Sequence, residues 1–323
     1  MAPGKVTSDA PSGVFAVTDP TLQQDYFYCR QVMRSVSKNY SFASRFLPKE
    51  KLHHVEALYA FLRVGDDRVD VSHSGFASAL DAIEDWERSY WRAFDTRNSP
   101  DPVLRAYLNT AHQCGIPAET MLPYFRAMKE DLTITRYPTF ADLLHYMEGS
   151  AMTVGRGMTC ILGIKSPYCY ADVLPYADAL SIAMQLSNFW RDIAYDWKIG
   201  RVYIPQEDMQ RFGVSETHLA AGQVTPDFVA LMEFEFARTE SYYQQARLGV
   251  PQLAAGQWGV QSGLEIYRSI LTIIRCRGYN VFSQRRASAS ELHKLSLVSR
   301  AWLSTHIPTR QSSSSPIPSS DPT

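Results

Sequence analysis

Apolar residues recur at spacings of three and four over most of the chain, which is the period of an amphipathic helix. Alternating strand patterns are nearly absent, and only RVYI at 201–204 looks extended. Pro and Gly residues such as Pro48 and Gly200 separate the helical segments. We therefore predict an all-α fold with helices near residues 21–37, 49–71, 75–95, 101–113, 117–131, 138–163, 170–197, 226–248, 258–279 and 287–303.

The two ends of the chain differ in composition from the part between them. Residues 1–20 are rich in Pro, Gly, Ser and Thr and are predicted to form a disordered leader. Residues 304–323 contain seven Ser, three Thr and four Pro, which predicts a disordered tail. Of all 323 residues 45% are apolar, so residues 21–303 can form one domain with a large core.

Charge and cysteine content exclude several classes of function. With 32 Lys and Arg against 33 Asp and Glu, the chain has no basic footprint for nucleic acid. The sequence contains no run of about 18 apolar residues, so no membrane-spanning helix is predicted. The first 13 residues do not resemble a secretory signal. Five widely spaced Cys without a CxxC motif predict reduced thiols in a cytoplasmic protein. Peripheral association with a membrane stays open, and no oligomeric state is predicted.

Two pairs of aspartates lie in strongly apolar helical segments. Asp66 and Asp70 are four residues apart and share a helix face with Tyr59 and Arg63. In the second segment the same pattern recurs at Gln185, Asn188, Asp192 and Asp196, on a helix that is apolar nearly all round. Such a helix belongs in the interior, where a carboxylate needs a partner.

A divalent cation is the partner that this pattern favours. Like charges four residues apart repel each other, whereas Mg²⁺ binds one or two protein carboxylates together with water and phosphate oxygens. Arg63, Arg191 and Arg201 lie beside the aspartates and can hold phosphate oxygens. We therefore predict a Mg²⁺–diphosphate clamp between two helices. The structural alternatives are solvated carboxylates on a helix face and salt bridges between each Arg and a neighbouring carboxylate.

These segments resemble the squalene/phytoene synthase family of head-to-head prenyl diphosphate condensing enzymes. The similarity covers about residues 25–300 and is carried by SKNYSFASRFLPKEK at 37–51, YAFLRVGDDRVD at 59–70, YMEGSAMTVGRG at 146–157, QLSNFWRDIAYDWKIGRVYIPQEDM at 185–209, GLEIYRSIL at 263–271 and GYNVFSQRR at 278–286. The resemblance implies the isoprenoid synthase fold, a single helical bundle around a central cavity. Val36, Glu148 and Gln284 depart from the family pattern.

The resemblance also implies roles for individual residues. Metal binding is implied for Asp66, Asp70, Asn188, Asp192 and Asp196. Binding of the substrate is implied for Ser37, Lys38, Asn39, Tyr59, Arg63, Gln185, Asn188, Arg191, Arg201 and Tyr267. Among these, Tyr59 and Arg63 join the four aspartates as catalytic candidates. The implied cofactor is Mg²⁺, with Mn²⁺ as the alternative.

The reaction implied is the Mg²⁺-dependent joining of two prenyl diphosphates through a cyclopropylcarbinyl diphosphate. Ser37, Ser41 and Ser44 fall near one face of their segment, and small side chains there favour a long substrate. We therefore predict that two geranylgeranyl diphosphates are joined to phytoene, in carotenoid biosynthesis. Aromatic faces at Tyr40, Phe42, Tyr59 and Tyr267 are candidates to stabilise carbocations.

Several alternatives stay open at this point. The segment NFWRD resembles hydroxysqualene synthases, so the joining of two farnesyl diphosphates to squalene, hydroxysqualene or dehydrosqualene is the main one. NADPH is expected only if squalene is the product. A non-catalytic isoprenoid-binding subunit is expected to lose metal aspartates, and all four are present. A terpene cyclase is disfavoured because the second motif is DxxxD.

Overall fold

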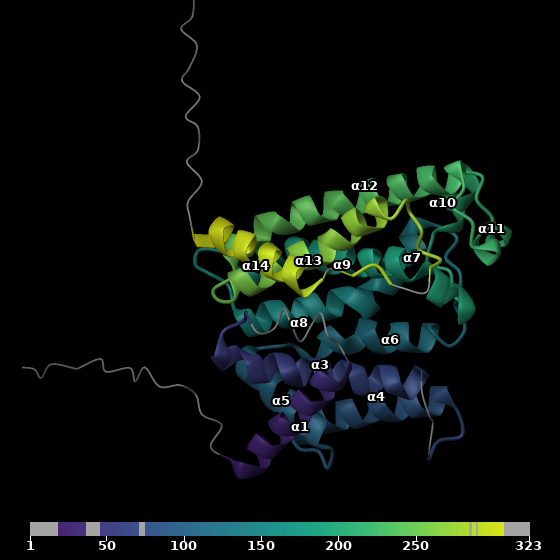
Figure 1. The fold of residues 1–323 in the computed structure, drawn as a ribbon. Coiled ribbons are helices and arrows are strands. Elements are labelled where there is room, and N and C mark those ends of the chain that lie inside the picture. Colours follow the sequence, from purple (N-terminus) through teal and green to yellow (C-terminus); the bar gives the residue numbers. More distant parts are fainter. Residues whose placement is uncertain (1–18, 37–45, 71–74, 284–285, 289, 307–323) are drawn as a thin grey trace, which may run out of the picture.

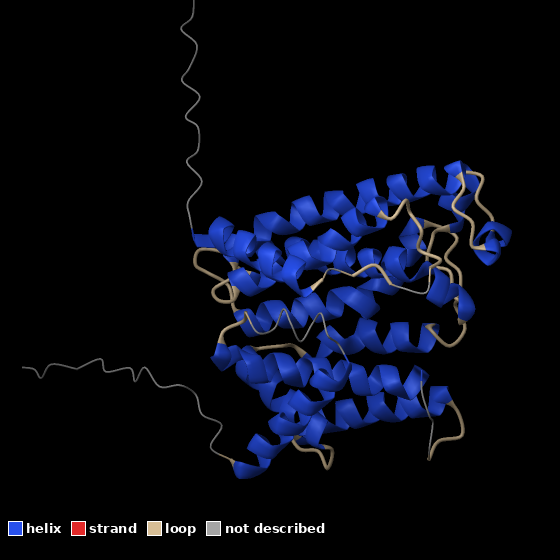
Figure 2. Cartoon of the chain, viewed as in Figure 1, coloured by secondary structure: helices blue, strands red, loops and turns tan. Residues whose placement is uncertain are grey.

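The fold is known from a computed structural model that describes residues 19–36, 46–70, 75–283, 286–288 and 290–306. Helices make up most of this part of the chain (Figure 2). They are α1 (Pro20–Val36), α3 (Lys49–Asp70), α4 (Ala79–Thr96), α5 (Pro102–Cys114), η1 (Ala118–Met121), α6 (Leu122–Glu130), α7 (Phe140–Met147), η2 (Glu148–Met152), α8 (Thr153–Leu162), α9 (Tyr170–Lys198), α10 (Gln206–Arg211), α11 (Glu216–Ala221), α12 (Pro226–Gly249), η3 (Val250–Gln252), α13 (Gln257–Cys276) and α14 (Glu291–His306).

Side chains at the helix ends explain where several helices begin. Asp101 accepts hydrogen bonds from the backbone N–H groups of Val103 (2.8 Å) and Leu104 (3.0 Å), with Pro102 at the first helical position of α5. Ser78 caps α4 and Thr225 caps α12 in the same way. These residues satisfy backbone donors that have no partner within the helix.

The helices form a stack in which α8 separates two groups. Helices α1, α3, α4 and α5 pack together on one side, and α9, α12, α13 and α14 on the other (Figure 1). Helix α8 contacts both α3 and α9, and α6 contacts the turn η2 that precedes α8. A single large apolar cluster runs through both groups. This arrangement leaves room for a cavity along the faces of α3, α8, α9 and α13.

Aromatic packing fixes α3, and polar contacts fix α9. Phe61 of α3 stacks on Tyr107 of α5 with ring centroids 4.4 Å apart, a contact worth about 0.5–1.5 kcal/mol beyond the buried area. On α9, the indole N–H of Trp190 donates to Thr239 of α12 at 2.8 Å. Ser187 of α9 and Tyr243 of α12 are also hydrogen bonded at 2.8 Å. Each of the two helices that carry the aspartates is therefore anchored.

The structure confirms the all-α prediction and differs from the expected helices in several places. The helix predicted over 117–131 begins as the 3-10 turn η1 and continues as α6. The predicted helix over 138–163 is a helical run in three parts, because the π-helical turn η2 joins α7 to α8. The short helices α10 and α11 were not predicted, since six residues are too few to show a helical period. Within the described residues no helix is long and apolar enough to cross a membrane.

The segment RVYI at 201–204, which the sequence predicts to be extended, lies in the loop that follows α9. Gly200 has a φ of 82°, a left-handed conformation that suits Gly. Val202 then pairs with Arg136 in an isolated parallel bridge. The Arg136 guanidinium donates to the Gly200 carbonyl at 2.6 Å and pairs with Glu216 of α11 at 2.5 Å. These contacts fix the position of the loop that carries Arg201.

Candidate active site

A cavity of about 340 Å³ lies between α3, α6, α8, α9 and α13. This volume falls within the roughly 300–1,000 Å³ that is typical of small-molecule sites. Most of its wall is apolar, with the hydroxyl groups of Ser150, Thr159 and Ser181 also in the lining, and three helices contribute its charged and amide side chains together with two tyrosines. They are Tyr59, Arg63 and Asp66 of α3, Gln185 and Asn188 of α9, and Tyr267 of α13. The cavity thus combines a hydrophobic body with a polar end that offers both cationic and oxygen donor groups.

Gly65 allows Tyr124 to pack beside Asp66. A Cβ at Gly65 would lie 1.9 Å from the Tyr124 hydroxyl, so only Gly lets Tyr124 approach α3. The Tyr124 hydroxyl donates to the Leu62 carbonyl at 2.7 Å and lies 3.4 Å from the Asp66 carboxylate. Burial and the nearby Asp66 charge raise the pKa of Tyr124 far above its usual value. Tyr124 therefore stays protonated and remains a hydrogen-bond donor beside Asp66.

The second aspartate segment lies further along α9, beyond the residues that line the cavity. The Asp192 carboxylate forms ion pairs with Arg191 at 2.6 Å and with Arg286 at 3.1 Å. Arg286 also lies over the Tyr195 ring, 4.6 Å from its centroid. Asp192 is thus held by two cations, each of which can also bind a phosphate oxygen.

Asp196 lies one helical turn after Asp192, in a position that is less favourable for a charged carboxylate. Burial, followed by the charge of Asp192, raises the pKa of Asp196 to about 7. The nearby guanidinium groups of Arg201, Arg286 and Arg191 oppose this shift without cancelling it. The Arg201 backbone N–H donates to the Asp196 carbonyl at 2.8 Å. A partly buried carboxyl with such a raised pKa marks a place where added positive charge would be stabilising.

A family model described as squalene/phytoene synthase matches residues 33–293. The chain belongs to the squalene/phytoene synthase family. It is 32% identical over 277 residues to 15-cis-phytoene synthase of Synechococcus elongatus, covering 82% of this chain and 88% of that protein. Against 15-cis-phytoene synthase of Synechocystis sp. the identity is 30% over 292 residues, covering 88% and 86%.

Comparison with solved structures leads to the same family. A dehydrosqualene synthase superposes with a TM-score of 0.80 at 28% identity, covering 88% of this chain and 98% of that one. Squalene synthase HpnC from Alicyclobacillus acidocaldarius gives 0.72 at 28% identity, covering 80% and 96%. The predicted family and isoprenoid synthase fold are therefore confirmed, and the chain is a prenyltransferase of the squalene/phytoene synthase family.

The structure brings only some of the predicted site residues to the cavity. Tyr59, Arg63, Asp66, Gln185, Asn188 and Tyr267 line it. Asp196 and Arg201 line a smaller hollow beside Phe189 and Tyr203. Asp70 is the last residue of α3, and its side chain lies outside the described part. Ser37, Lys38 and Asn39, together with Tyr40, Ser41, Phe42 and Ser44, also lie outside the described residues.

All three arginines make the ion pairs that the sequence left open as an alternative. Arg63 pairs with Asp67, the carboxylate next to Asp66, while its side chain still lines the cavity. Arg191 pairs with Asp192. Arg201 pairs with Asp131 at 3.9 Å and also donates to the backbone carbonyl of that residue at 3.3 Å. Each of these arginines thus has a carboxylate counterion in this structure.

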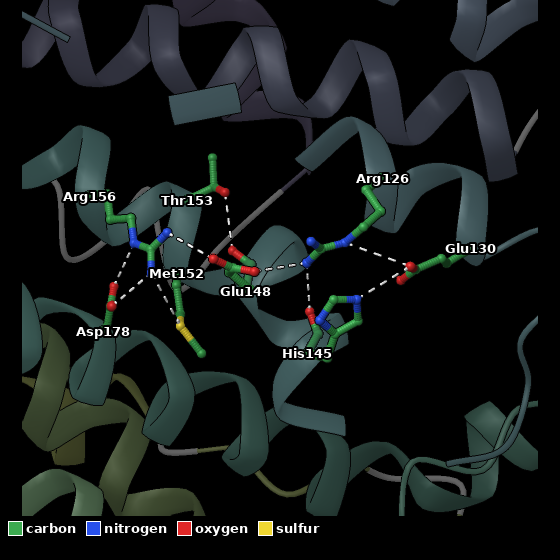
Figure 3. A network of polar contacts seen from close by, with 8 residues as sticks. All are labelled: Arg126, Glu130, His145, Glu148, Met152, Thr153, Arg156 and Asp178. Carbon is green, nitrogen blue, oxygen red and sulfur yellow. Dashed lines mark hydrogen bonds and ion pairs between the residues drawn. The ribbon is translucent and has the colours of Figure 1, made fainter. Parts of the chain in front are cut away.

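Residues that sequence reasoning missed also contribute to the site. Tyr124 and Arg286 lie far from the aspartates in sequence, although SQRR contains a visible arginine pair. Glu148, noted only as a departure from the family pattern, lies on the π-helical turn between two arginines (Figure 3). It pairs with Arg126 of α6 at 2.9 Å and with Arg156 of α8 at 3.4 Å. These ion pairs connect three of the elements that line the cavity.

Proposed function

We propose that the enzyme joins two geranylgeranyl diphosphates head to head and releases phytoene. The observation that carries this proposal is the cavity itself, with an apolar body and a polar end built from Arg63, Asp66 and Asn188. A prenyl diphosphate has the same division into a hydrocarbon chain and an anionic head. The 32% identity to a 15-cis-phytoene synthase over most of both chains supports the C20 substrate.

The donor atoms at the polar end fit Mg²⁺, with Mn²⁺ as the alternative. Asp66 offers carboxylate oxygens, and Asn188 offers an amide oxygen in the same cavity. Among the described side chains, no group of three or more Asp, Glu, His or Cys could hold one ion. Each ion would then keep few protein ligands and complete its shell with water and diphosphate, as Mg²⁺ commonly does. Asp70 is proposed to bind metal together with Asp66. Asp192 and Asp196 are proposed to bind metal on the opposite side of the cavity.

Bound Mg²⁺ would neutralise the diphosphate and make it a better leaving group. The protein's own residues orient the substrates and exclude water. Arg63, Arg191 and Arg286 would hold diphosphate oxygens, and Arg201 and Gln185 would support them from the loop and from α9. The faces of Tyr59 and Tyr267 can stabilise a carbocation by about 0.5–2 kcal/mol each.

The reaction proceeds in two stages. In the first, one diphosphate leaves, the double bond of the second substrate attacks the allylic cation, and proton loss gives a cyclopropylcarbinyl diphosphate. In the second, this intermediate loses its diphosphate and rearranges so that the two C1 carbons are joined, and a final proton loss gives phytoene. No hydride donor is consumed, so NADPH is not required.

The joining of two farnesyl diphosphates is the second candidate. It is favoured by the dehydrosqualene synthase structure, which superposes with a TM-score of 0.80. The two candidates differ in the hydrocarbon that forms. Purified enzyme is incubated with Mg²⁺ and either geranylgeranyl or farnesyl diphosphate, with and without NADPH, and the products are identified by mass spectrometry.

We expect a C40 hydrocarbon from geranylgeranyl diphosphate without NADPH. A C30 product alone would show that the substrate is farnesyl diphosphate. If neither substrate gives a hydrocarbon, the proposed reaction is wrong.

We further propose a cytoplasmic enzyme that associates peripherally with membranes, because substrates and product are both lipophilic. Large apolar side chains exposed on its surface, such as Phe27 (56%) and Leu248 (63%), support this proposal. Flotation of the purified protein with phosphatidylglycerol vesicles tests it, and recovery of all protein in the unbound fraction would refute it.

A further inference from the structure

Charged residues of alternating sign form an ion-pair network across the π-helical turn η2: Glu130, Arg126, Glu148, Arg156 and Asp178 (Figure 3). Glu148 lies at its centre, with one carboxylate oxygen 2.9 Å from Arg126 and the other 3.4 Å from Arg156. The outer pairs are Arg126–Glu130 at 3.6 Å and Arg156–Asp178 at 2.9 Å. Partial burial raises the pKa of Glu148, but the two arginines outweigh this and hold it below its usual range, so the carboxylate is charged at neutral pH. The network therefore ties α6, η2, α8 and α9 to one another.

The ion-pair network lies on the outer side of the cavity wall. Glu148 and Arg126 are partly exposed to solvent, each with 35% of its side chain accessible. The network residues themselves do not line the cavity, whereas close neighbours of theirs in sequence do: Tyr124, Met128, Ser150, Gly155 and Ala177. A single layer of helices, about 10 Å thick, thus separates the network from the cavity.

Two seams between helices of this wall have no side chain to fill them. At the seam between η2 and α6, a Cβ on Gly149 would lie 2.0 Å from the Pro123 carbonyl oxygen. At the seam between α8 and α9, a Cβ on Gly155 would lie 2.1 Å from the Ser181 hydroxyl oxygen. The helices can approach this closely because glycine has no side chain. Ion pairs close the outer edge of each seam, Arg126–Glu148 at the first and Arg156–Asp178 at the second.

The inner side of the same turn carries a hydroxyl group. Ser150 lines the cavity, and its buried hydroxyl has no hydrogen-bond partner among the described residues. Buried polar groups in this state commonly bind water. A water molecule that passed the seam between η2 and α6 would therefore be held at the cavity wall.

We propose that Glu148 is a positioning residue that keeps water out of the cavity by holding both seams closed. This inference rests on the proposed function, in which a carbocation forms in the cavity and ends by losing a proton. A water molecule inside the cavity would instead form a C–O bond with the cation and release a proton, and the product would be a prenyl alcohol. Glu148 acts on this outcome through the wall and does not touch the substrate.

Variants can weaken the seams without changing the cavity lining. Glu148→Gln removes the charge at the centre of the network with little change of shape. Arg126→Gln removes the ion pair at the seam between η2 and α6, and it replaces Glu148→Gln if that variant does not fold. Glu233→Gln is the matched control, because Glu233 pairs with Arg275 at 2.7 Å between α12 and α13, is 42% exposed and does not line the cavity. Circular dichroism and thermal unfolding check folding, and each variant should melt only a few degrees below the wild type, since partly exposed ion pairs contribute little stability.

The experiment measures how much of the product is alcohol. Each enzyme is incubated with Mg²⁺ and geranylgeranyl diphosphate in water enriched in ¹⁸O, and the products are analysed by mass spectrometry. Attack of water on a cation places ¹⁸O on carbon, whereas a contaminating phosphatase cleaves the P–O bond and leaves the oxygen of the substrate. Glu148→Gln should raise the share of ¹⁸O-labelled alcohol roughly two- to fivefold, because loss of a partly exposed ion pair shifts the population of open seams by about that factor. Glu233→Gln should keep the wild-type share.

A role of Glu148 in folding alone would lower total turnover and leave the alcohol share unchanged. Folded Glu148→Gln and Arg126→Gln enzymes with the wild-type share would therefore overturn the inference.

The failure of the proposed function can be told apart from the failure of this inference. If the wild type makes hydrocarbon only from farnesyl diphosphate, the proposed C20 substrate is wrong, and the alcohol share is measured with the C15 substrate instead. If it makes no product from either, hydrogen–deuterium exchange of peptides over residues 146–157 decides. Exchange that is faster in Glu148→Gln and unchanged in Glu233→Gln supports the closed seams, and exchange that is unchanged in Glu148→Gln overturns them.

Discussion

Replacing Asp196 by Asn should stabilise the metal-free enzyme while removing its activity. Asp196 has its pKa raised from 3.8 to about 7 by burial and by Asp192. As the pH rises from 4 to 7, the unfolded chain releases this proton first, so the wild-type fold loses stability over that window. Asn carries no charge at any of these pH values, and the variant avoids the loss.

The size of the effect follows from the pKa. At about 1.4 kcal/mol per pKa unit, a rise of the Asp196 pKa from 3.8 to about 7 can cost the wild-type fold at most about 4 kcal/mol of stability. Partial contact with solvent reduces this to about 1–3 kcal/mol. With about 2–4 °C of melting temperature per kcal/mol in a chain of this size class, Asp196→Asn should melt several degrees above the wild type at pH 8.

The assay is thermal unfolding in EDTA at pH values from 4 to 8.5. The melting temperature of Asp196→Asn minus that of the wild type should be near zero at pH 4, grow through pH 7 and then level off. Asp192→Asn is the matched control, because Asp192 is held by Arg191 and Arg286 and its loss should destabilise the fold. If Asp196→Asn is less stable than the wild type at pH 8, or if the difference does not change with pH, burial of a charged Asp196 does not limit the stability of the fold.

Further predictions concern α3 and the metal. Gly65→Ala should cost about 1–3 kcal/mol and lower activity, because its Cβ would meet the Tyr124 hydroxyl; an unchanged melting temperature and kcat would contradict this. Asp66→Asn should abolish turnover, whereas Asp67→Asn should cost at most about 1 kcal/mol of stability, since its pair with Arg63 is partly exposed; equal loss of turnover in both variants would argue against a distinct role for Asp66. EDTA should stop hydrocarbon formation and excess Mg²⁺ should restore it, which product analysis checks.

Long helices with a clear period could be predicted from the sequence to within a few residues. The helix expected over 226–248 is α12 at Pro226–Gly249, because Thr225 and Pro226 mark its start. The helices α10 and α11 could not be predicted, since their positions depend on contacts such as the pair between Arg136 and Glu216. The π-helical turn η2 likewise has no sequence period of its own.

The site could be predicted as far as it lies within single helices. The spacing on α3 and α9 pointed to Arg63, Asp66 and Asn188, and all three line one cavity in the structure. Contributions from distant segments could not be found in this way. The approach of Tyr124 to Asp66 depends on the missing Cβ of Gly65, and Arg286 reaches Asp192 across 94 positions of sequence.

We propose that the aspartates of α3 and α9 bind metal ions at the head of one cavity. Crystals soaked with Mn²⁺ and an unreactive prenyl thiolodiphosphate can test this by anomalous diffraction. We expect anomalous peaks within about 2.5 Å of carboxylate oxygens on both helices, with the diphosphate between them and the prenyl chain along the apolar part of the cavity. A bound diphosphate without a peak near Asp66 or near Asp192 and Asp196 would contradict it.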